Sequence, residues 1–228
     1  MTRLILSLLT AVVAVFLVSL SLGPADVSLG ESLAALFDDS YGPLTLVMQE
    51  IRLPRAILAV VIGGGLGLAG AAMQGYLRNP LAEPGLIGVS SSAALGAVLA
   101  INTGLAASLT LGLPLAALAG ALAGVFLVMA LAGPQGGSLT LILAGIAISA
   151  MAAALTSLVL NLSPNPFAAN EIVFWMMGSL ADRSMLHVWL VLPFALTGAA
   201  ILMTLSRGLD ALTLGEDAAQ TMGMNLNR

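Results

Sequence analysis

The sequence predicts an all-α protein whose helices cross a membrane several times. Hydrophobic residues make up 59% of the 228 residues and charged residues only 8%, whereas soluble domains carry about 25% charged residues. Uncharged runs at 4–25, 84–170 and 184–206 each provide the roughly 20 apolar residues that one helical crossing needs. The chain has too few polar side chains to cover a soluble globule, and a bilayer removes that need because its core is itself apolar.

We expect six membrane spans. They lie at about 4–22, 56–76, 86–101, 109–131, 139–160 and 185–205. The first could be mistaken for a signal peptide, but its apolar run is long for one and Ser21-Leu22-Gly23-Pro24 is a poor cleavage site, so we expect a retained helix. The third is the shortest, and we expect it to be little tilted or sheltered by protein.

Two polar connections separate some of these spans. The segment 24–51 holds five acidic residues, and we expect a short amphipathic helix at 29–37 within it. The segment 161–183 is expected to contain a short helix at 172–180. With the N-terminus in the cytoplasm, four of the seven arginines fall on inner segments, in weak agreement with the positive-inside rule. Arg52 and Arg55 then lie outside and oppose it.

Small residues recur within the expected spans. Gly63 and Gly67 form one GxxxG motif, and Gly120 and Gly124 form another. Helices in lipid associate through close backbone contact rather than through the hydrophobic effect. We therefore expect these glycines to mediate tight helix packing, with a substrate-contacting glycine face as the alternative.

The composition also excludes several kinds of site. Without Cys there is neither a disulfide nor a thiolate metal site, and the single His187 does not provide the three or four ligands of a zinc site. The chain has no Lys, its arginines do not cluster, and its net charge is −4. These features give no footprint for nucleic acid, and we expect no metal site and no nucleic-acid partner.

The arginine motif Arg52-Leu53-Pro54-Arg55 opens the second span, and residues 70–75 close it. The run Asn79-Pro80-Leu81-Ala82-Glu83-Pro84-Gly85 follows, and residues 143–147 and 214–223 add two further segments. Together these segments resemble the FecCD-type permeases, the type II ABC importer subunits for iron-siderophores, haem and cobalamin, and the run 79–85 is highly specific. The resemblance covers essentially the whole chain. Family members have about ten spans, so we expect residues 1–228 to be the N-terminal part of a single, C-terminally truncated permease domain.

The resemblance implies that residues 207–228 form a cytoplasmic segment that couples the permease to an ATPase. From the residues themselves, Thr213 and Glu216 have the spacing of a capping box, acidic side chains suit the first helical turn, and Gly223 suits the helix end. The alternative is a solvated surface helix. The coupling residues are expected to be Leu214, Gly215, Glu216, Asp217, Ala218, Ala219 and Gly223.

The resemblance also implies roles for three further groups. External Arg52 and Arg55 are expected to dock the substrate-binding protein by pairing with its glutamates, with snorkelling helix anchors as the alternative. A cytoplasmic gate loop is expected at Asn79, Pro80, Leu81 and Glu83, with a merely connecting loop as the alternative. The translocation path is expected to be lined by Ser149, Thr156 and Ser157, whose hydroxyls could instead bond neighbouring helices.

We therefore predict a permease subunit of an ATP-driven ABC importer in a bacterial inner membrane. It would move a ferric siderophore from a periplasmic or extracellular binding protein into the cytoplasm, with cobalamin or haem as alternatives. No P-loop motif is present, so ATP and Mg are expected on a separate ATPase dimer, and the chain is expected to be neither an enzyme nor a cofactor binder. A second permease subunit, identical or related, is the remaining protein partner.

Other classes fit less well. Ion-coupled transporters place ionisable residues inside their spans, and these spans have almost none. An intramembrane enzyme would need a nucleophile with its base, paired carboxylates or a zinc motif, none of which is visible.

Overall fold

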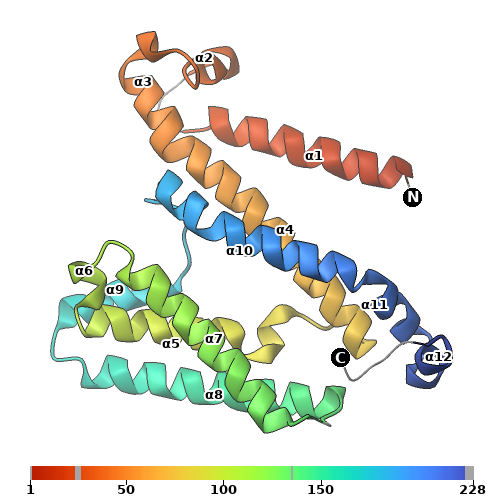
Figure 1. Cartoon of the computed structure of the whole chain (residues 1–228). Coiled ribbons are helices and arrows are strands. Elements are labelled where there is room, and N and C mark those ends of the chain that lie inside the picture. The colour runs from red at the N-terminus through yellow and green to blue at the C-terminus, as the bar shows by residue number, and fades with distance from the viewer. Residues whose placement is uncertain (1, 24–26, 135, 224–228) are drawn as a thin grey trace. The chain divides into compact units, whose positions relative to one another are not determined.

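The structure is a computed structural model that describes residues 2–23, 27–134 and 136–223, without the side chains of 166 and 216–218. All regular elements in these ranges are helical (Figure 1). The long helices are α1 (Thr2–Ser21), α4 (Leu53–Leu77), α7 (Gly112–Ala132), α8 (Ser138–Leu162) and α10 (Met185–Thr204). Shorter elements connect them: α2 (Leu29–Ala34), η1 (Asp39–Tyr41), α3 (Pro43–Leu46), η2 (Val47–Arg52), η3 (Pro84–Ile87), α5 (Val89–Asn102), α6 (Leu105–Ser108), α9 (Pro166–Met176), α11 (Ser206–Thr213) and α12 (Glu216–Thr221).

Five of the six expected spans are helices long and apolar enough to cross a membrane. The second of them is continuous with α3 and η2 and covers Pro43–Leu77, 35 residues. The expected span at 86–101 is the exception. Its helix α5 has 14 residues, which is about 21 Å at 1.5 Å per residue and shorter than the roughly 30 Å hydrocarbon core. This segment, expected to be the shortest span, is therefore not among the helices of the described chain that are long enough to count as membrane spans.

The connecting helices α2 and α9 each begin directly after a capping residue. Ser28 and Glu31 form a capping box at α2, which is shorter than the expected 29–37. In the other connection the helix starts at 166, six residues before the expected start. Asn165 accepts a hydrogen bond from the amide of Phe167 at 3.0 Å, and Pro166 at the first helical position suits the helix start because it needs no amide donor.

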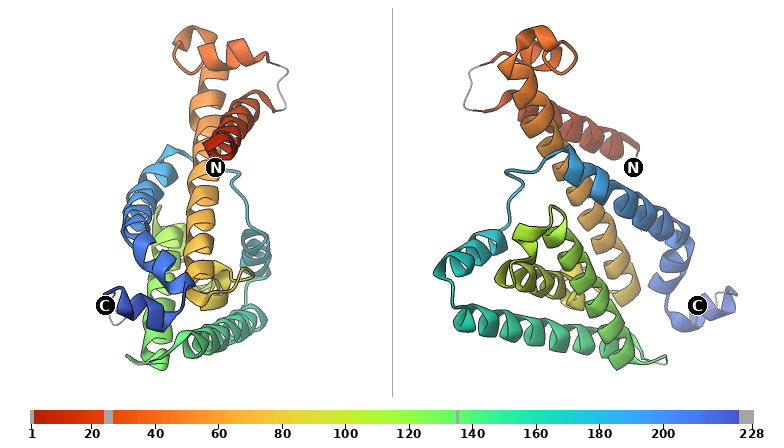
Figure 2. Two further views of the ribbon diagram at one scale, coloured as in Figure 1. Left: turned by 90° about the vertical axis from the view of Figure 1, so that its right-hand side faces the viewer. Right: turned by 60° about the vertical axis from the view of Figure 1, so that its left-hand side comes forward.

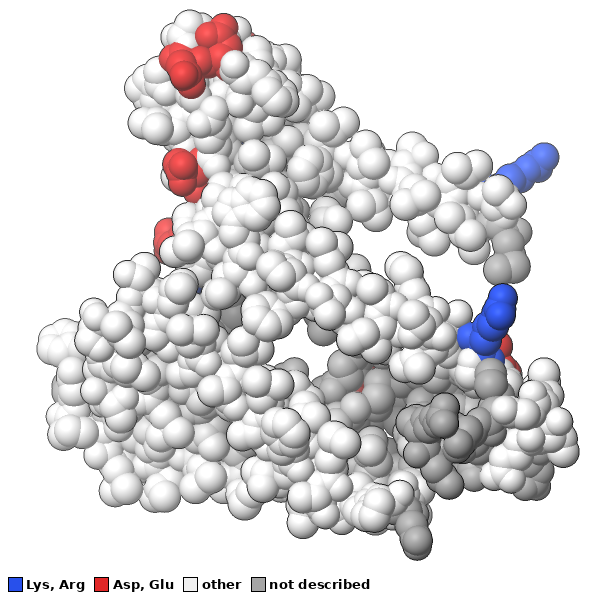
Figure 3. All heavy atoms as spheres, in the orientation of Figure 1, with Lys and Arg blue, Asp and Glu red and all other residues white. Residues whose placement is uncertain are grey.

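The chain divides into two compact units, which are described separately. The first comprises Met1–Leu68 and Leu180–Ser206. Its core joins the end of α1 to α2 and to the start of α4, through the fully buried residues Leu20, Ala35, Met48 and Ala56. The segment between α1 and α4 carries exposed acidic side chains, whereas nearly all of the visible surface of α1 is uncharged (Figure 3). These acidic residues are Glu31, Asp38, Asp39 and Glu50.

The second unit comprises Ala69–Ser179 and Arg207–Arg228. Helix α5 packs against α7, α8 and α9, and Figure 2 shows these helices as neighbours in two further views. Val98 and Ile101 of α5 meet Ile172 of α9 in one buried cluster. A second cluster holds Val128 of α7 with Ala144 and Ile148 of α8. The short α5 is thus sheltered by protein, as its length predicted.

The two GxxxG motifs have different environments. A Cβ added at Gly120 would collide with the backbone of Ser92, and one added at Gly124 would collide with the Ser92 side chain. The prediction of tight packing is confirmed there. By contrast, a Cβ at Gly63 or Gly67 would meet nothing within 4 Å among the described residues, so the motif on α4 makes no such contact within this part of the chain.

Candidate functional site

Helix α4 carries expected functional residues at both of its ends. The arginine motif lies at its start, and the expected gate loop follows directly after Leu77. Its 25 residues span about 37 Å, which is enough to cross the hydrocarbon core. Residues at the two ends of α4 therefore belong to opposite sides of the membrane.

Arg52 is not the exposed side chain that a docking role predicts. Only 6% of it is accessible to solvent. Its Nη1 donates hydrogen bonds to the carbonyl oxygens of Leu20 at 2.9 Å and of Ser21 at 3.1 Å. The guanidinium of Arg52 therefore turns inward onto the end of α1, and its docking role stays a prediction.

The helix geometry before α4 explains this orientation. Residues Val47–Arg52 form a π-helical turn, η2, which is wider than an α-turn and changes where side chains point. Met48 and Arg52 are both buried on its inner side. The sequence motif alone carried no signal of this turn.

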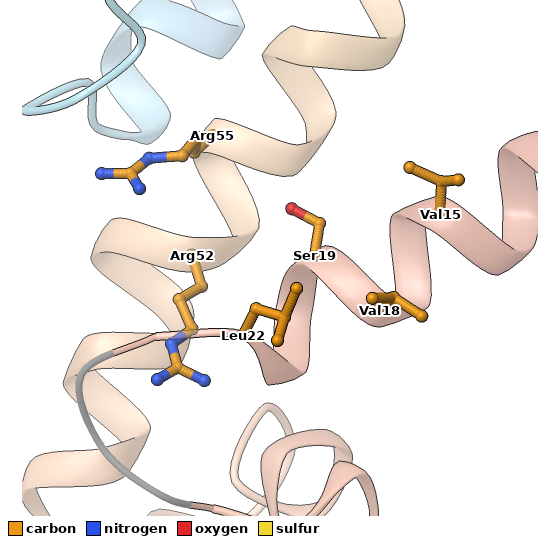
Figure 4. A pocket seen from close by; sticks show the side chains of 6 residues that line it. All are labelled: Val15, Val18, Ser19, Leu22, Arg52 and Arg55. Atoms are coloured by element: carbon orange, nitrogen blue, oxygen red, sulfur yellow. The ribbon is translucent and has the colours of Figure 1, made fainter.

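Arg55, one turn further along α4, is exposed. It borders an open cavity of about 320 Å³ between α1 and α4 (Figure 4). Val15, Val18 and Leu22 provide an apolar wall, and Ser19 and the two arginines complete the lining. Of the two arginines, only Arg55 retains the exposure that contact with a partner requires.

The expected gate loop is a built turn rather than a loose connection. Arg78 ends α4 in a left-handed conformation with φ 51°. The side chain of Asn79 then accepts a hydrogen bond from the amide of Leu81 at 2.9 Å, an Asx-type turn. Leu81 is 85% exposed, and Pro80 and Glu83 are exposed as well. An apolar side chain is therefore presented at the tip of a fixed turn.

The same end of α4 meets the segment expected to couple to an ATPase. Gln74 donates from Nε2 to the carbonyl of Ala82 at 3.5 Å, a long bond that links α4 to the gate loop. A Cβ at Gly75 would lie 3.5 Å from Cβ of Leu209 on α11. Three residues after Gly75, Nη1 of Arg78 lies 3.9 Å from the point that a Cβ on Gly215 would occupy. The gate loop and the coupling segment thus both lie beside the end of α4.

The coupling segment consists of two short helices instead of one helix over 214–223. The hydroxyl of Thr213 donates back to the carbonyl of Asp210 at 2.6 Å, so Thr213 ends α11 and does not cap α12. The expected start of the helix after Thr213 is wrong, because α12 begins at Glu216, directly after Gly215. Gly215 has a φ of +109°, a conformation that favours glycine. The amide of Ala219 donates to the carbonyl of Gly215 at 3.0 Å.

The remaining coupling residues are only partly described. Leu214 is exposed and Ala219 is fully buried. Gly223 follows α12 with φ +80°, as predicted for a helix end. The side chains of Glu216, Asp217 and Ala218, and residues 224–228, lie outside the described part of the structure. The functional roles of the segment stay predictions.

The three hydroxyl residues expected on the translocation path do not share one environment. Thr156 is buried, with 4% accessible to solvent, and Ser149 is half-buried against Gly88, which precedes α5. Ser157 is exposed on α8. Lining of a path stays a prediction; Ser157 is exposed, Ser149 is partly exposed and Thr156 is buried.

Sequence reasoning missed the residues that support these sites. They are Gly23 and the α1 carbonyls around Arg52, and Gln74, Gly75 and Leu209 around the gate loop. The amphipathic pattern of α11 could have identified Leu209 as a packing residue. No group of three or more metal-ligating side chains occurs among the described residues.

The comparison with known proteins decides the family. The model of the FecCD transport family matches residues 10–228. The chain belongs to this family. The match includes the arginine motif, the gate loop and the described part of the coupling segment, on which the resemblance was stated.

Named relatives are permeases of several importers. The uncharacterized ABC transporter permease protein YvrB of Bacillus subtilis is 39% identical, over 81% of this chain and 53% of the relative. The cobalamin import system permease protein BtuC of Halobacterium salinarum is 38% identical, over 80% and 49%. The ferric enterobactin transport system permease protein FepD of Escherichia coli is 37% identical, over 80% and 54%.

A solved structure agrees with the fold. It is described as a metal-chelate type ABC transporter in an inward-facing conformation, and it matches 99% of this chain and 68% of its own with a TM-score of 0.83 at 30% identity. The chain spans about half the length of the curated relatives it matches. With five apolar helices long enough to cross a bilayer, this FecCD protein is a multi-pass membrane protein, which confirms the predicted fold class.

Proposed function

We propose that this chain acts as a membrane permease of an ATP-driven importer in a bacterial inner membrane, with a ferric siderophore as its substrate. The N-terminus lies in the cytoplasm in this proposal. A separate ATPase dimer binds ATP and Mg, a binding protein delivers the substrate outside, and a second permease subunit completes the pathway.

One observation carries this proposal further than the family assignment. The end of α4 supports both the gate loop and the coupling segment, through Gln74 to Ala82, Gly75 to Leu209 and Arg78 to Gly215. A displacement of α11 and α12 by an ATPase would therefore act on the end of α4, which leads into the gate loop that bears Leu81. Helices and tight turns transmit such movements because packed elements shift as units.

Iron chelates are the preferred substrates, and cobalamin is the alternative. A relative named for ferric enterobactin and one named for cobalamin have nearly equal identity to this chain. The apolar Leu81 and the small hydroxyls of α8 suit a large chelate that passes without tight binding. These side chains do not discriminate between the two substrates.

The test is co-purification in detergent with the ATPase encoded beside this chain. The wild-type chain is expected to retain the ATPase, and deletion of 214–223 is expected to abolish retention. Gly64→Ala provides a matched control, since a Cβ there meets nothing within 4 Å in the described structure. A membrane-inserted wild-type chain that retains no ATPase would contradict the proposal.

Substrate choice needs a second measurement. Proteoliposomes that contain the complex and the binding protein are expected to accumulate radiolabelled ferric siderophore when ATP is supplied. Accumulation of radiolabelled cobalamin, with no uptake of iron, would replace the substrate and keep the permease function.

A further inference from the structure

The guanidinium of Arg52 closes the C-terminal end of α1. The last carbonyl groups of a helix lack partners within the helix and carry the negative end of its dipole. Helix α1 has no basic residue in its own last turn. Arg52 instead reaches the carbonyls of Leu20 and Ser21 with a single nitrogen, Nη1, across 31 or 32 positions of sequence.

Gly23 shapes the space that the guanidinium occupies. A Cβ built at Gly23 would overlap Nη2 of Arg52 and would lie 2.7 Å from Cζ and 3.0 Å from Nε. Any larger residue at position 23 must therefore displace the guanidinium. The room left by Gly23 is an observation independent of the hydrogen bonds to α1, and both concern the same guanidinium.

The charge of Arg52 is held by carbonyl groups. Within the described ranges no carboxylate forms an ion pair with it, and Nη2 is buried without a hydrogen-bond partner there. A buried guanidinium is expensive to desolvate, and the two hydrogen bonds to the carbonyls of Leu20 and Ser21 offset part of that cost. They join α1 to the buried core of Leu20, Met48 and Ala56.

We infer that Arg52 is a positioning residue, a clamp that fixes the end of α1 to the start of α4, and that Arg55 alone of the arginine pair is free to contact a partner. The two arginines therefore have different functions although their sequence motif makes them look equivalent. The docking half of this inference rests on the proposed function, whereas the clamp does not.

The clamp is tested by a double-mutant cycle. Arg52→Gln and Gly23→Ala are each expected to lower the melting midpoint of the purified chain by several degrees. The double variant is expected to melt no lower than the worse single variant, because the new methyl group at position 23 then has no guanidinium to displace. Arg52→Lys is expected to recover only part of the loss, since an ammonium lacks the planar guanidinium.

A distance measurement separates positioning from general stability. The chain has no Cys, so spin labels can be attached at Ser7→Cys on α1 and Ile62→Cys on α4 without background. Below the melting midpoint, Arg52→Gln is expected to broaden the distribution of distances between the labels. Arg55→Gln is expected to leave it unchanged.

Docking of the binding protein is measured over a range of salt concentrations. Arg55→Gln is expected to lower affinity by up to about fivefold, the range of an exposed ion pair, and to flatten the dependence on salt. Arg52→Gln is expected to lower affinity while the salt dependence stays as in the wild type. A matching loss of salt dependence at Arg52 would overturn the division of roles.

The clamp and the docking proposal fail separately. Additive effects of Gly23→Ala and Arg52→Gln, or an unchanged label distribution in Arg52→Gln, would overturn the clamp whatever the docking result. If the wild-type chain binds no substrate-binding protein, the proposed function fails, and the cycle and the labels still decide the clamp.

Discussion

Replacing Gly120 by alanine should separate α5 from α7. The two helices approach so closely that a Cβ at Gly120 would lie 3.1 Å from Cα and 3.2 Å from the amide nitrogen of Gly96, and it would collide with the carbonyl oxygen of Ser92. All of these are backbone atoms. No flexible side chain can yield, so the helices must move apart by an amount on the order of 1 Å to restore ordinary contact.

The size of the effect follows from the dispersion energy that this separation removes. A gap of 0.5 to 1 Å removes about a quarter to a half of the dispersion energy of each atom pair. If about 30 pairs across the crossing each lose a third of roughly 0.15 kcal/mol, the loss is about 1.5 kcal/mol. This lies within the roughly 1–3 kcal/mol typical of overpacked cores, and it corresponds to a fall in melting midpoint of about 3–6 °C.

The assay is the melting midpoint of the detergent-solubilised chain, followed by circular dichroism. Gly64→Ala is the matched control, because it lies inside α4 and its Cβ would meet nothing within 4 Å among the described residues. Both variants gain the same helix propensity from alanine, so their difference isolates the packing term. Equal midpoints for Gly120→Ala and Gly64→Ala would refute the close approach of α5 and α7.

Three further predictions concern the connecting segments. Ser28→Ala should raise the rate of proteolysis in the 27–53 segment about fivefold through loss of the N-cap. Hydrogen bonds from the Ser28 hydroxyl and amide hold the pKa of Glu31 below its ordinary value. Protection of the wild-type segment from proteolysis should therefore be full above the ordinary pKa and should decline as the pH falls through the lowered pKa. Protection from proteolysis that does not change with pH would contradict this. Gly215→Ala should stiffen and strain the turn between α11 and α12. It should lower the stimulation of ATPase activity by substrate and leave membrane insertion unchanged. Unchanged stimulation would count against the role of this turn. Asn79→Ala should speed hydrogen exchange at the Leu81 amide, while Asn79→Asp retains protection; unchanged exchange in Asn79→Ala would show that the turn does not depend on this side chain.

The boundaries of the long helices follow closely from the sequence. Apolar runs bounded by polar or glycine-rich segments predicted all five long helices to within a few residues, because a crossing segment must satisfy its own backbone and can do so only as a helix. The capping box at Ser28 and Glu31 was not predicted, although its residues are of the types that cap helices. The start of α9 was missed because Asn165 and Pro166 were assigned to the connection and not to the helix cap.

The length of α5 was harder to predict. The segment 86–101 is apolar, but a 3₁₀ turn at Pro84–Ile87 and the left-handed Gly88 delay the helix until Val89. Hydropathy reports the environment of a segment and not its conformation. A short helix sheltered by α7 and α8 and a full membrane span therefore look alike in sequence.

The composition and motifs by themselves determined that the chain is a multi-pass helical membrane protein with the signature of its family. Those properties depend on local composition and on short runs of residues. Only the tertiary structure decided that Arg52 is buried while Arg55 is exposed, because the burial of Arg52 depends on a π-helical turn and on carbonyls more than 30 positions away. It also decided that Gly120 is packed and Gly63 is not. A GxxxG motif can face a neighbouring helix or an open side. The spacing of its glycines along one helix does not show which of the two it faces.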